Sequence, residues 1–207
     1  MRTKNIFISF EGVEGSGKST QVGLLSSKLR EQGKEIVVVR EPGGTRIGEQ
    51  IREITHNREN VDLTAVSESY LMASSRAQLV REIIHPALLS GKIVIADRFI
   101  DSSLAYQGFG RQLGEEVIWN LNKLAIDDVM PNLTLFLDVS PEIGFKRRNS
   151  SYKIDRLDLQ QKDFFERVYQ GYKKLAEKYK ERYVIIDGKG TVNQTAGKVW
   201  EKVKKLL

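Results

Sequence analysis

Short apolar runs alternate along the chain with longer segments in which apolar residues recur every three or four positions. The short runs predict strands, at 6–10, 35–40, 92–96, 133–139 and 183–187. The longer segments predict helices, at about 18–32, 45–57, 64–90, 114–129, 160–181 and 191–206. Nearly continuous apolar strands are typical of a parallel sheet that is buried on both faces. We therefore expect a single three-layer α/β domain over residues 1–207, with a five-stranded parallel sheet flanked by helices.

A phosphate-binding motif lies between the first predicted strand and the first predicted helix. The sequence from Gly12 to Thr20, GVEGSGKST, fits G-x-x-x-x-G-K-[ST] at every fixed position. In such a loop the glycines let backbone N–H groups turn toward a polyphosphate, and the following helix adds the positive end of its dipole. Lys18 can reach the β- and γ-phosphates, and the Ser19 hydroxyl can ligate Mg²⁺. The motif predicts a nucleotide-phosphate site in a P-loop NTPase fold.

Composition excludes several classes of protein. There are no cysteines among the 207 residues, so disulfides and thiolate metal sites are excluded. The N-terminal apolar run is too short for a signal peptide, and no apolar run approaches the roughly 20 residues that span a bilayer. We expect a cytoplasmic protein without a membrane partner.

The net charge of +6 is concentrated near the C-terminus. Residues 1–140 hold 16 Lys and Arg against 18 Asp and Glu, whereas residues 141–207 hold 17 against 9. A nucleic-acid surface and a phosphate-binding cluster beside solvated helices both fit such an excess. We favour the second interpretation, without nucleic acid as a partner, because no aromatic residues are interleaved with the basic ones.

Charged residues follow the second and third predicted strands, where ligands bind in parallel α/β sheets. Arg40 precedes the turn Glu41-Pro42-Gly43-Gly44, and a solvated arginine in a strand-to-helix turn is the alternative for it. Asp97 ends the third strand, where P-loop proteins place a carboxylate for the metal. Arg98, directly after it, can bind a second phosphate.

Other polar groups are candidates for a small-molecule pocket. Met72 and Arg76 are i, i+4 neighbours on one predicted helix, and the small residues around Arg76 favour a donor that faces a cleft. Residues 102–111 follow Asp97-Arg98 closely and are rich in hydrogen-bonding groups. The two histidines lack partners at ligand spacing, so we assign them no chemistry.

With the P-loop, the Glu-Pro-Gly-Gly-Thr turn, the Asp-Arg pair and the Ala-Tyr-Gln-Gly segment in this order, the chain resembles the bacterial thymidylate kinase family over essentially its whole length. The resemblance implies Mg²⁺-dependent transfer of the γ-phosphate of ATP to dTMP, giving dTDP, in a homodimer. It implies that ATP lies on Arg147 and on the P-loop residues Gly12, Val13, Glu14, Gly15, Ser16, Gly17, Lys18, Ser19 and Thr20. Ser19 and Asp97 would organise the metal.

The resemblance also assigns the dTMP site. Arg98 matches the arginine on the dTMP phosphate, and Arg40 lies where another phosphate contact is expected. Arg76 matches the arginine that donates to thymine, and Glu14 the acidic residue that faces the sugar. The remaining contacts implied are Met72, Ser103, Tyr106 and Gln107.

Two of these positions depart from the family. Met72 stands where an aromatic residue often stacks on the base, and a thioether can still cover the ring. Ser103 stands where some relatives have an asparagine. Tyr106 matches the tyrosine that disfavours a 2′-hydroxyl.

The P-loop has no positively charged residue at its variable positions, so we look for the catalytic cation elsewhere in the chain. Phosphoryl transfer needs positive charge at the migrating group, and Val13, Glu14, Gly15 and Ser16 carry no cation. The polar segment 146–158, KRRNSSYKIDRLD, resembles the lid of relatives whose lid carries the basic residues. We expect Lys153 and Arg156 to act with Lys18 and Arg98 in catalysis; a solvated basic loop is the alternative.

Two other functions fit parts of the pattern. The same core could phosphorylate another nucleoside monophosphate or a deoxynucleoside. A regulatory P-loop ATPase would need no second small ligand, so the constellation of Arg76, Arg98 and Tyr106 argues against it.

Overall fold

The computed structural model describes residues 5–147 and 155–207. Its centre is a five-stranded sheet with the order β2-β3-β1-β4-β5, in which every neighbouring pair is parallel. The strands are β1 (Phe7–Glu11), β2 (Ile36–Arg40), β3 (Ile93–Asp97), β4 (Leu133–Asp138) and β5 (Tyr183–Asp187). The predicted parallel sheet and α/β class are confirmed.

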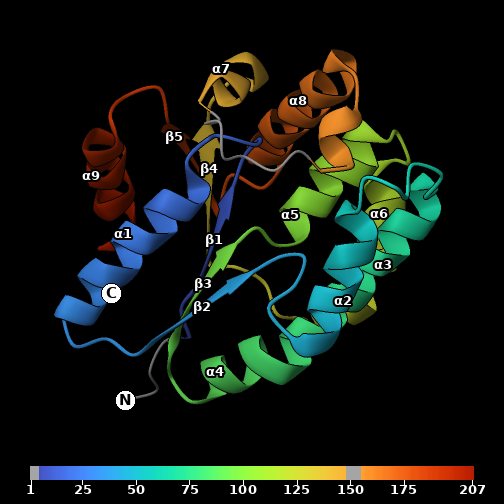
Figure 1. The fold of residues 1–207 in the computed structure, drawn as a ribbon. Helices are drawn as coiled ribbons and strands as arrows, with labels where there is room; N and C mark the ends of the chain where they lie inside the picture. The colour runs from blue at the N-terminus through green and yellow to red at the C-terminus, as the bar shows by residue number, and fades with distance from the viewer. Residues whose placement is uncertain (1–4, 148–154) are drawn as a thin grey trace.

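Helices cover both faces of this sheet, as Figure 1 shows. They are α1 (Lys18–Glu31), α2 (Arg46–His56), α3 (Ala65–Leu79), α4 (His85–Leu89), α5 (Ile100–Ser103), α6 (Glu115–Ile126), α7 (Pro141–Lys146), α8 (Lys162–Lys178) and α9 (Val192–Val203). The described residues also form the π-helical segments η1 (Val80–Ile84) and η2 (Leu104–Gly110) and the 3₁₀ turn η3 (Leu157–Leu159). The predicted helix 64–90 is therefore interrupted at η1, and the helices from 100 to 110 and from 141 to 146 were not predicted.

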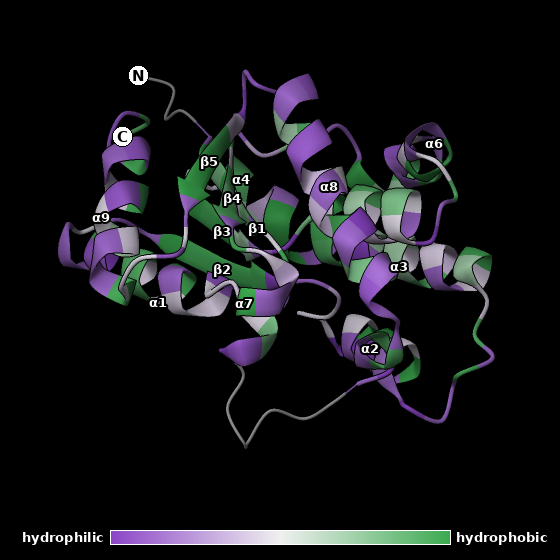
Figure 2. Cartoon of the chain, turned by 90° about the horizontal axis from the view of Figure 1, so that it is seen from above, coloured by the Kyte–Doolittle hydropathy of each residue, from purple (hydrophilic) through white to green (hydrophobic). Residues whose placement is uncertain are grey.

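Alternate residues of the strands divide the core into two halves. Ile8 and Phe10 of β1 face α1 and α9, and pack with Leu25 and Val199. Phe7 lies on the opposite face, in the larger cluster that includes α3, η2 and α8. Figure 2 shows the green strands enclosed by helices that are mostly purple on their outer sides. The pattern is that of a sheet buried on both faces.

The carboxyl ends of the strands form the edge where the chain turns into its functional loops. β1 continues into the P-loop and α1, β2 into residues 41–45, and β3 into α5. Phe10 and Asp97 are register partners, as are Arg40 and Asp97, so these loops start side by side.

Candidate active site

A cleft of about 790 Å³ lies at this edge. Its lining comes from the P-loop, from the ends of β2 and β3, from α3 and η2, and from the turn after β5. Sequence reasoning predicted most of its polar residues: Glu14, Lys18, Ser19, Arg40, Arg76, Asp97, Arg98, Ser103, Tyr106, Gln107 and Arg147. The structure brings these residues together in one cleft, although they span 134 positions of the sequence.

The P-loop backbone takes a shape that only glycine allows. Gly15 has φ 73°, and a Cβ atom there would lie 2.0 Å from the carbonyl oxygen of Gly144 in α7. Gly17 has φ 95° and directly precedes α1, so the first N–H groups of that helix open into the loop. These groups can bind an anion together with the helix dipole.

Lys18 is buried in the loop, and within the described part of the chain its ammonium hydrogen-bonds only to neutral groups. Its Nζ donates to the carbonyl oxygens of Gly12 at 3.1 Å and Val13 at 2.9 Å. Burial and the nearby charge of Arg98 lower the pKa of Lys18 to about 8. A phosphate would offer this ammonium the anionic partner that the loop lacks.

Two oxygen ligands suited to Mg²⁺ meet beside the loop. Ser19 Oγ donates to Asp97 Oδ2 at 2.5 Å across a sequence separation of 78 residues. A hydroxyl and a carboxylate are ligands that Mg²⁺ accepts, and the ion keeps water or phosphate oxygens as its other ligands. In the described residues no group of three or more acidic, histidine or cysteine side chains forms a metal cage. The pair therefore fits an ion that is shared with a substrate.

Arg98 hydrogen-bonds to five different residues around the cleft. Its Nη1 donates to Gly12 O at 2.8 Å, Tyr172 Oη at 3.0 Å and Ser102 Oγ at 3.1 Å. Its Nη2 donates to Glu14 Oε1 at 2.5 Å and to Tyr106 Oη at 3.2 Å. Although burial opposes the charge, Glu14 raises the pKa of Arg98 above its usual value.

Arg76 reaches the cleft from α3 but is itself deeply buried. Its guanidinium forms a buried salt bridge with Glu41. Its Nη1 also donates to Ser103 Oγ at 3.1 Å and Asn122 Oδ1 at 2.5 Å. Burial raises the pKa of Glu41 even though Arg76 opposes that shift. The salt bridge fixes the orientation of Arg76.

Other predicted contacts lie around these two arginines. Met72 lines the cleft on the same face of α3 as Arg76 and is half-buried. Arg40 lies at the rim, where its Nη2 donates to Glu49 Oε2 at 2.7 Å. Gln107 Nε2 donates to Glu68 Oε1 at 2.7 Å, so its amide is oriented by α3.

The basic residues of the predicted lid have different surroundings. Arg147 lines the cleft, and its Nη1 donates to Gly188 O at 2.9 Å. Arg156 is only 2% exposed; its guanidinium pairs with Glu68 and donates through Nε to Thr55 O at 2.9 Å. Lys146 is exposed and bonds Glu142. Lys153 lies outside the described residues.

Comparison with known proteins identifies the family. The sequence model described as thymidylate kinase matches residues 10–199. Thymidylate kinase of Geobacillus thermodenitrificans is 49% identical, over 87% of this chain and 81% of the relative. Thymidylate kinase of Clostridium novyi is 47% identical, over 99% of this chain and 98% of the relative. The crystal structure of thymidylate kinase from Ehrlichia chaffeensis superposes with a TM-score of 0.80 at 33% identity, covering 96% of this chain and 98% of that one.

The chain belongs to the thymidylate kinase family. It is thus an enzyme, a nucleoside monophosphate kinase, and the expected reaction, phosphorylation of dTMP to dTDP, is confirmed by this membership. The fold of the family member from Ehrlichia chaffeensis matches the five-stranded parallel sheet described above.

Several residues of this thymidylate kinase site were not predicted from sequence. Glu41 was interpreted only as part of a turn, and Glu68 and Tyr172 were not singled out. His56, for which no chemistry was expected, lines the cleft, where burial and Arg52 lower its pKa to about 4. Glu41 and Glu68 stand near glycine or serine residues, a common setting for an acidic residue. A single sequence therefore gives no signal that would select them.

Proposed function

We propose that the cleft binds ATP along the P-loop and dTMP beside Arg98, and transfers the γ-phosphoryl group in line between them. One observation carries this proposal: Lys18 Nζ and Arg98 Nη1 both donate to the carbonyl oxygen of Gly12, at 3.1 Å and 2.8 Å. One cation reaches this point from the donor side and one from the acceptor side. The arrangement suits a phosphoryl group that passes between two anionic oxygens.

On the donor side, the P-loop amides and Lys18 hold the ATP phosphates. Arg147 packs near adenine, since it lines the cleft beside Gly188, Gly190 and Thr191 at the end of β5. Ser19 and Asp97 would hold Mg²⁺. When bound, that ion neutralises charge on the phosphate oxygens.

On the acceptor side, Arg98 binds the dTMP phosphate and Arg76 donates toward thymine. Met72 covers the base, while Ser103 and Gln107 line its pocket. Glu14 and Tyr106 face the deoxyribose. Their contacts with Arg98 support this placement, because a nucleotide whose phosphate reaches Arg98 brings its sugar next to them. Arg40 supplies a further cation at the rim.

The lid supplies the cation of the transition state in this proposal, and Lys153 is its first candidate. Arg156 remains the second candidate. Its pairing with Glu68 means that it would have to leave a buried partner to reach a phosphate. Breaking a buried ion pair is expensive, on the order of 3–5 kcal/mol.

We further propose a cytoplasmic homodimer that has no nucleic-acid or membrane partner. Helices α3 and α6 pack together and leave large apolar side chains exposed, at Val66, Tyr70, Val117 and Leu124. An exposed apolar surface of this kind is typical of a protein interface. Among residues 5–147 and 155–207, no helix combines the length and the apolar character that a membrane span requires.

A phosphoacceptor screen tests the proposed substrates. Formation of ADP from Mg-ATP is measured with dTMP, dUMP, dCMP, AMP or no acceptor. We expect dTMP to be best, dUMP to lose about 1–3 kcal/mol for its missing methyl group, and dCMP to lose more because it offers Arg76 a donor. Equal kcat/KM for dTMP and dCMP would contradict the base assignment. ADP formation that needs no acceptor would contradict the kinase.

A further inference from the structure

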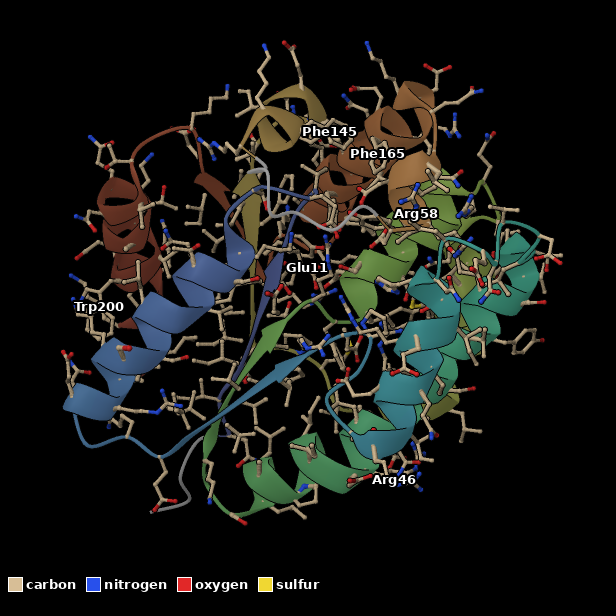
Figure 3. All side chains as sticks on the ribbon, in the orientation of Figure 1. Glu11, Arg46, Arg58, Phe145, Phe165 and Trp200 are labelled. Atoms are coloured by element: carbon tan, nitrogen blue, oxygen red, sulfur yellow. The ribbon has the colours of Figure 1, made fainter. Side chains whose placement is uncertain are left out.

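Glu11 is a fully buried carboxyl at the end of β1, directly before the P-loop. Figure 3 shows it in the interior, between the sheet and α5. Burying a carboxyl without partners is strongly unfavourable, so its hydrogen bonds are needed to keep it there. Its two oxygens face different parts of the molecule. Oε1 accepts from the backbone N–H of Phe99 at 2.8 Å and from Ser9 Oγ at 3.4 Å.

Oε2 of Glu11 faces the side chains around Arg98 instead of the sheet. It accepts from Ser102 Oγ at 2.6 Å and from Tyr172 Oη at 3.2 Å. The same two hydroxyl oxygens accept from Arg98 Nη1, at 3.1 Å and 3.0 Å. The two hydroxyls also lie 2.8 Å apart, so one of them can donate to the other while the second donates to Glu11. In either arrangement each hydroxyl oxygen keeps a lone pair for the guanidinium.

The backbone of Arg98 shows why such support is needed. Its φ of 74° lies in the left-handed region, where a residue with a side chain is held only if its surroundings enforce it. On one side Glu14 binds the guanidinium, and on the other the two hydroxyls do. Glu14 lines the cleft and is 29% exposed, whereas Glu11 is closed off from solvent. The interior support therefore rests on a carboxyl that is shielded from solvent, although Ser102 itself lines the cleft.

We propose that Glu11 is a positioning residue of the phosphotransfer reaction: through Ser102 and Tyr172 it holds the Arg98 guanidinium toward the acceptor phosphate. This inference rests on the proposed role of Arg98. Glu11 itself touches no substrate and is absent from the cleft lining. It therefore acts on dTMP only through Arg98.

A neighbouring carboxylate provides a matched control. Asp101 is as buried as Glu11, but it binds Arg182 Nη1 at 2.6 Å and Arg182 Nη2 at 2.7 Å, behind the sheet edge. Neither Asp101 nor Arg182 lines the cleft. Loss of Asp101 should weaken folding and lower the pKa of Glu11, so at a pH where Glu11 is already ionised it should leave Arg98 in place.

The test compares Glu11→Gln and Tyr172→Phe with wild type. Burial and Asp101 raise the pKa of Glu11 to about 8, so assays are run above that pH, where the carboxylate prevails. The Gln amide would donate to the hydroxyl oxygens and compete with Arg98, while Tyr172→Phe removes one hydroxyl and keeps the carboxyl. We expect each to raise KM for dTMP about 2- to 10-fold, the range of one hydrogen bond, with KM for ATP unchanged. If Glu11→Gln does not fold, the KM for dTMP of Tyr172→Phe alone tests the inference.

Two control variants and one double-mutant comparison separate the proposed role from a general structural one. Asp101→Asn and Ser9→Ala should leave KM for dTMP at the wild-type value. In an Arg98→Lys background, Glu11→Gln should add nothing to KM. The inference is overturned if both test variants keep the wild-type KM, if the controls raise it equally, or if the Glu11 effect persists without Arg98. A wild-type KM in Arg98→Lys alone would overturn the proposed role of Arg98, and the inference with it.

Discussion

The proposed acceptor and donor halves of the cleft hold their cations in opposite ways. The acceptor-side arginines are already paired with carboxylates, Arg98 with Glu14 and Arg76 with Glu41. On the donor side, Lys18 is held by backbone carbonyl oxygens at 2.9 Å and 3.1 Å. Paired arginines have a fixed orientation before substrate arrives, whereas Lys18 has no hydrogen-bonded carboxylate among residues 5–147 and 155–207. The acceptor half is thus organised for geometry, and the donor half for the binding of charge.

The largest effect is expected from Lys153 of the predicted lid. Lys153→Met should lower kcat by about 10³–10⁵-fold if it supplies the transition-state cation, the range attributed to an arginine finger. KM for dTMP should change only a few-fold, because the contact forms mainly in the transition state. Single-turnover kinetics isolates this step, and a wild-type rate there would place the cation elsewhere.

Arg156→Met separates catalysis from anchoring within the same segment. If Arg156 stays with Glu68, the variant should lose about 3–5 kcal/mol of unfolding free energy and keep its single-turnover rate when folded. If Arg156 is catalytic, the rate should fall while thermal unfolding changes little. Measuring both quantities on one preparation decides between the roles, and Glu68→Gln serves as the matched variant of the partner.

Lys18→Ala should remove the charge on which the donor half depends. We expect kcat to fall by at least about 10²–10³-fold, as when one transition-state donor is removed, with the fold intact. Circular dichroism and thermal unfolding check the fold, and Lys146→Ala on the exposed surface of α7 is a control. An unfolded Lys18→Ala protein, or near-normal kcat, would contradict the assignment.

A pH titration sharpens the contrast between the halves. The pKa of Lys18 is about 8 in the free enzyme, and bound phosphate favours the charged form. Above that pH, ATP binding must take up a proton, and apparent affinity should fall by up to about tenfold per pH unit. Calorimetry in buffers of different ionisation enthalpy measures the uptake. The prediction fails if Lys18→Ala takes up the same number of protons.

The smallest effect is expected at Met72, which is proposed to cover the thymine base. Met72→Phe should tighten dTMP binding by about 2- to 10-fold, since an aromatic stacking contact adds about 0.5–1.5 kcal/mol. Equilibrium titration with dTMP measures this, and ATP affinity should not change. Weaker dTMP binding in the Phe variant would show that the thioether does not lie over the ring.

The sequence predicts the parts of this fold that depend on local pattern. The five strands and the P-loop follow from apolar runs and a fixed spacing, and Asp97 and Arg98 follow from their place at the end of β3. The helical segment Ile100–Gly110 was not predicted from the sequence. Most of it is the π-helical η2, which contains Gly108 and Gly110 and lacks the ordinary helical period.

The partners of the functional residues depend on contacts that no local pattern carries. Arg76 meets Glu41 across 35 residues, and Arg156 meets Glu68 across 88. A single sequence shows that these arginines are charged and near motifs. It does not show which carboxylate each one binds, and that pairing decides whether the side chain faces the cleft.

Binding measured for each substrate alone tests the division of the cleft most directly. Isothermal titration with dTMP, and separately with a non-hydrolysable ATP analogue, compares wild type with Arg98→Lys and Lys18→Ala. We predict that Arg98→Lys weakens dTMP by about 10- to 100-fold, the value of a charge-assisted contact, and leaves the ATP analogue unchanged. Lys18→Ala should do the reverse. The account is contradicted if Arg98→Lys weakens the ATP analogue and spares dTMP.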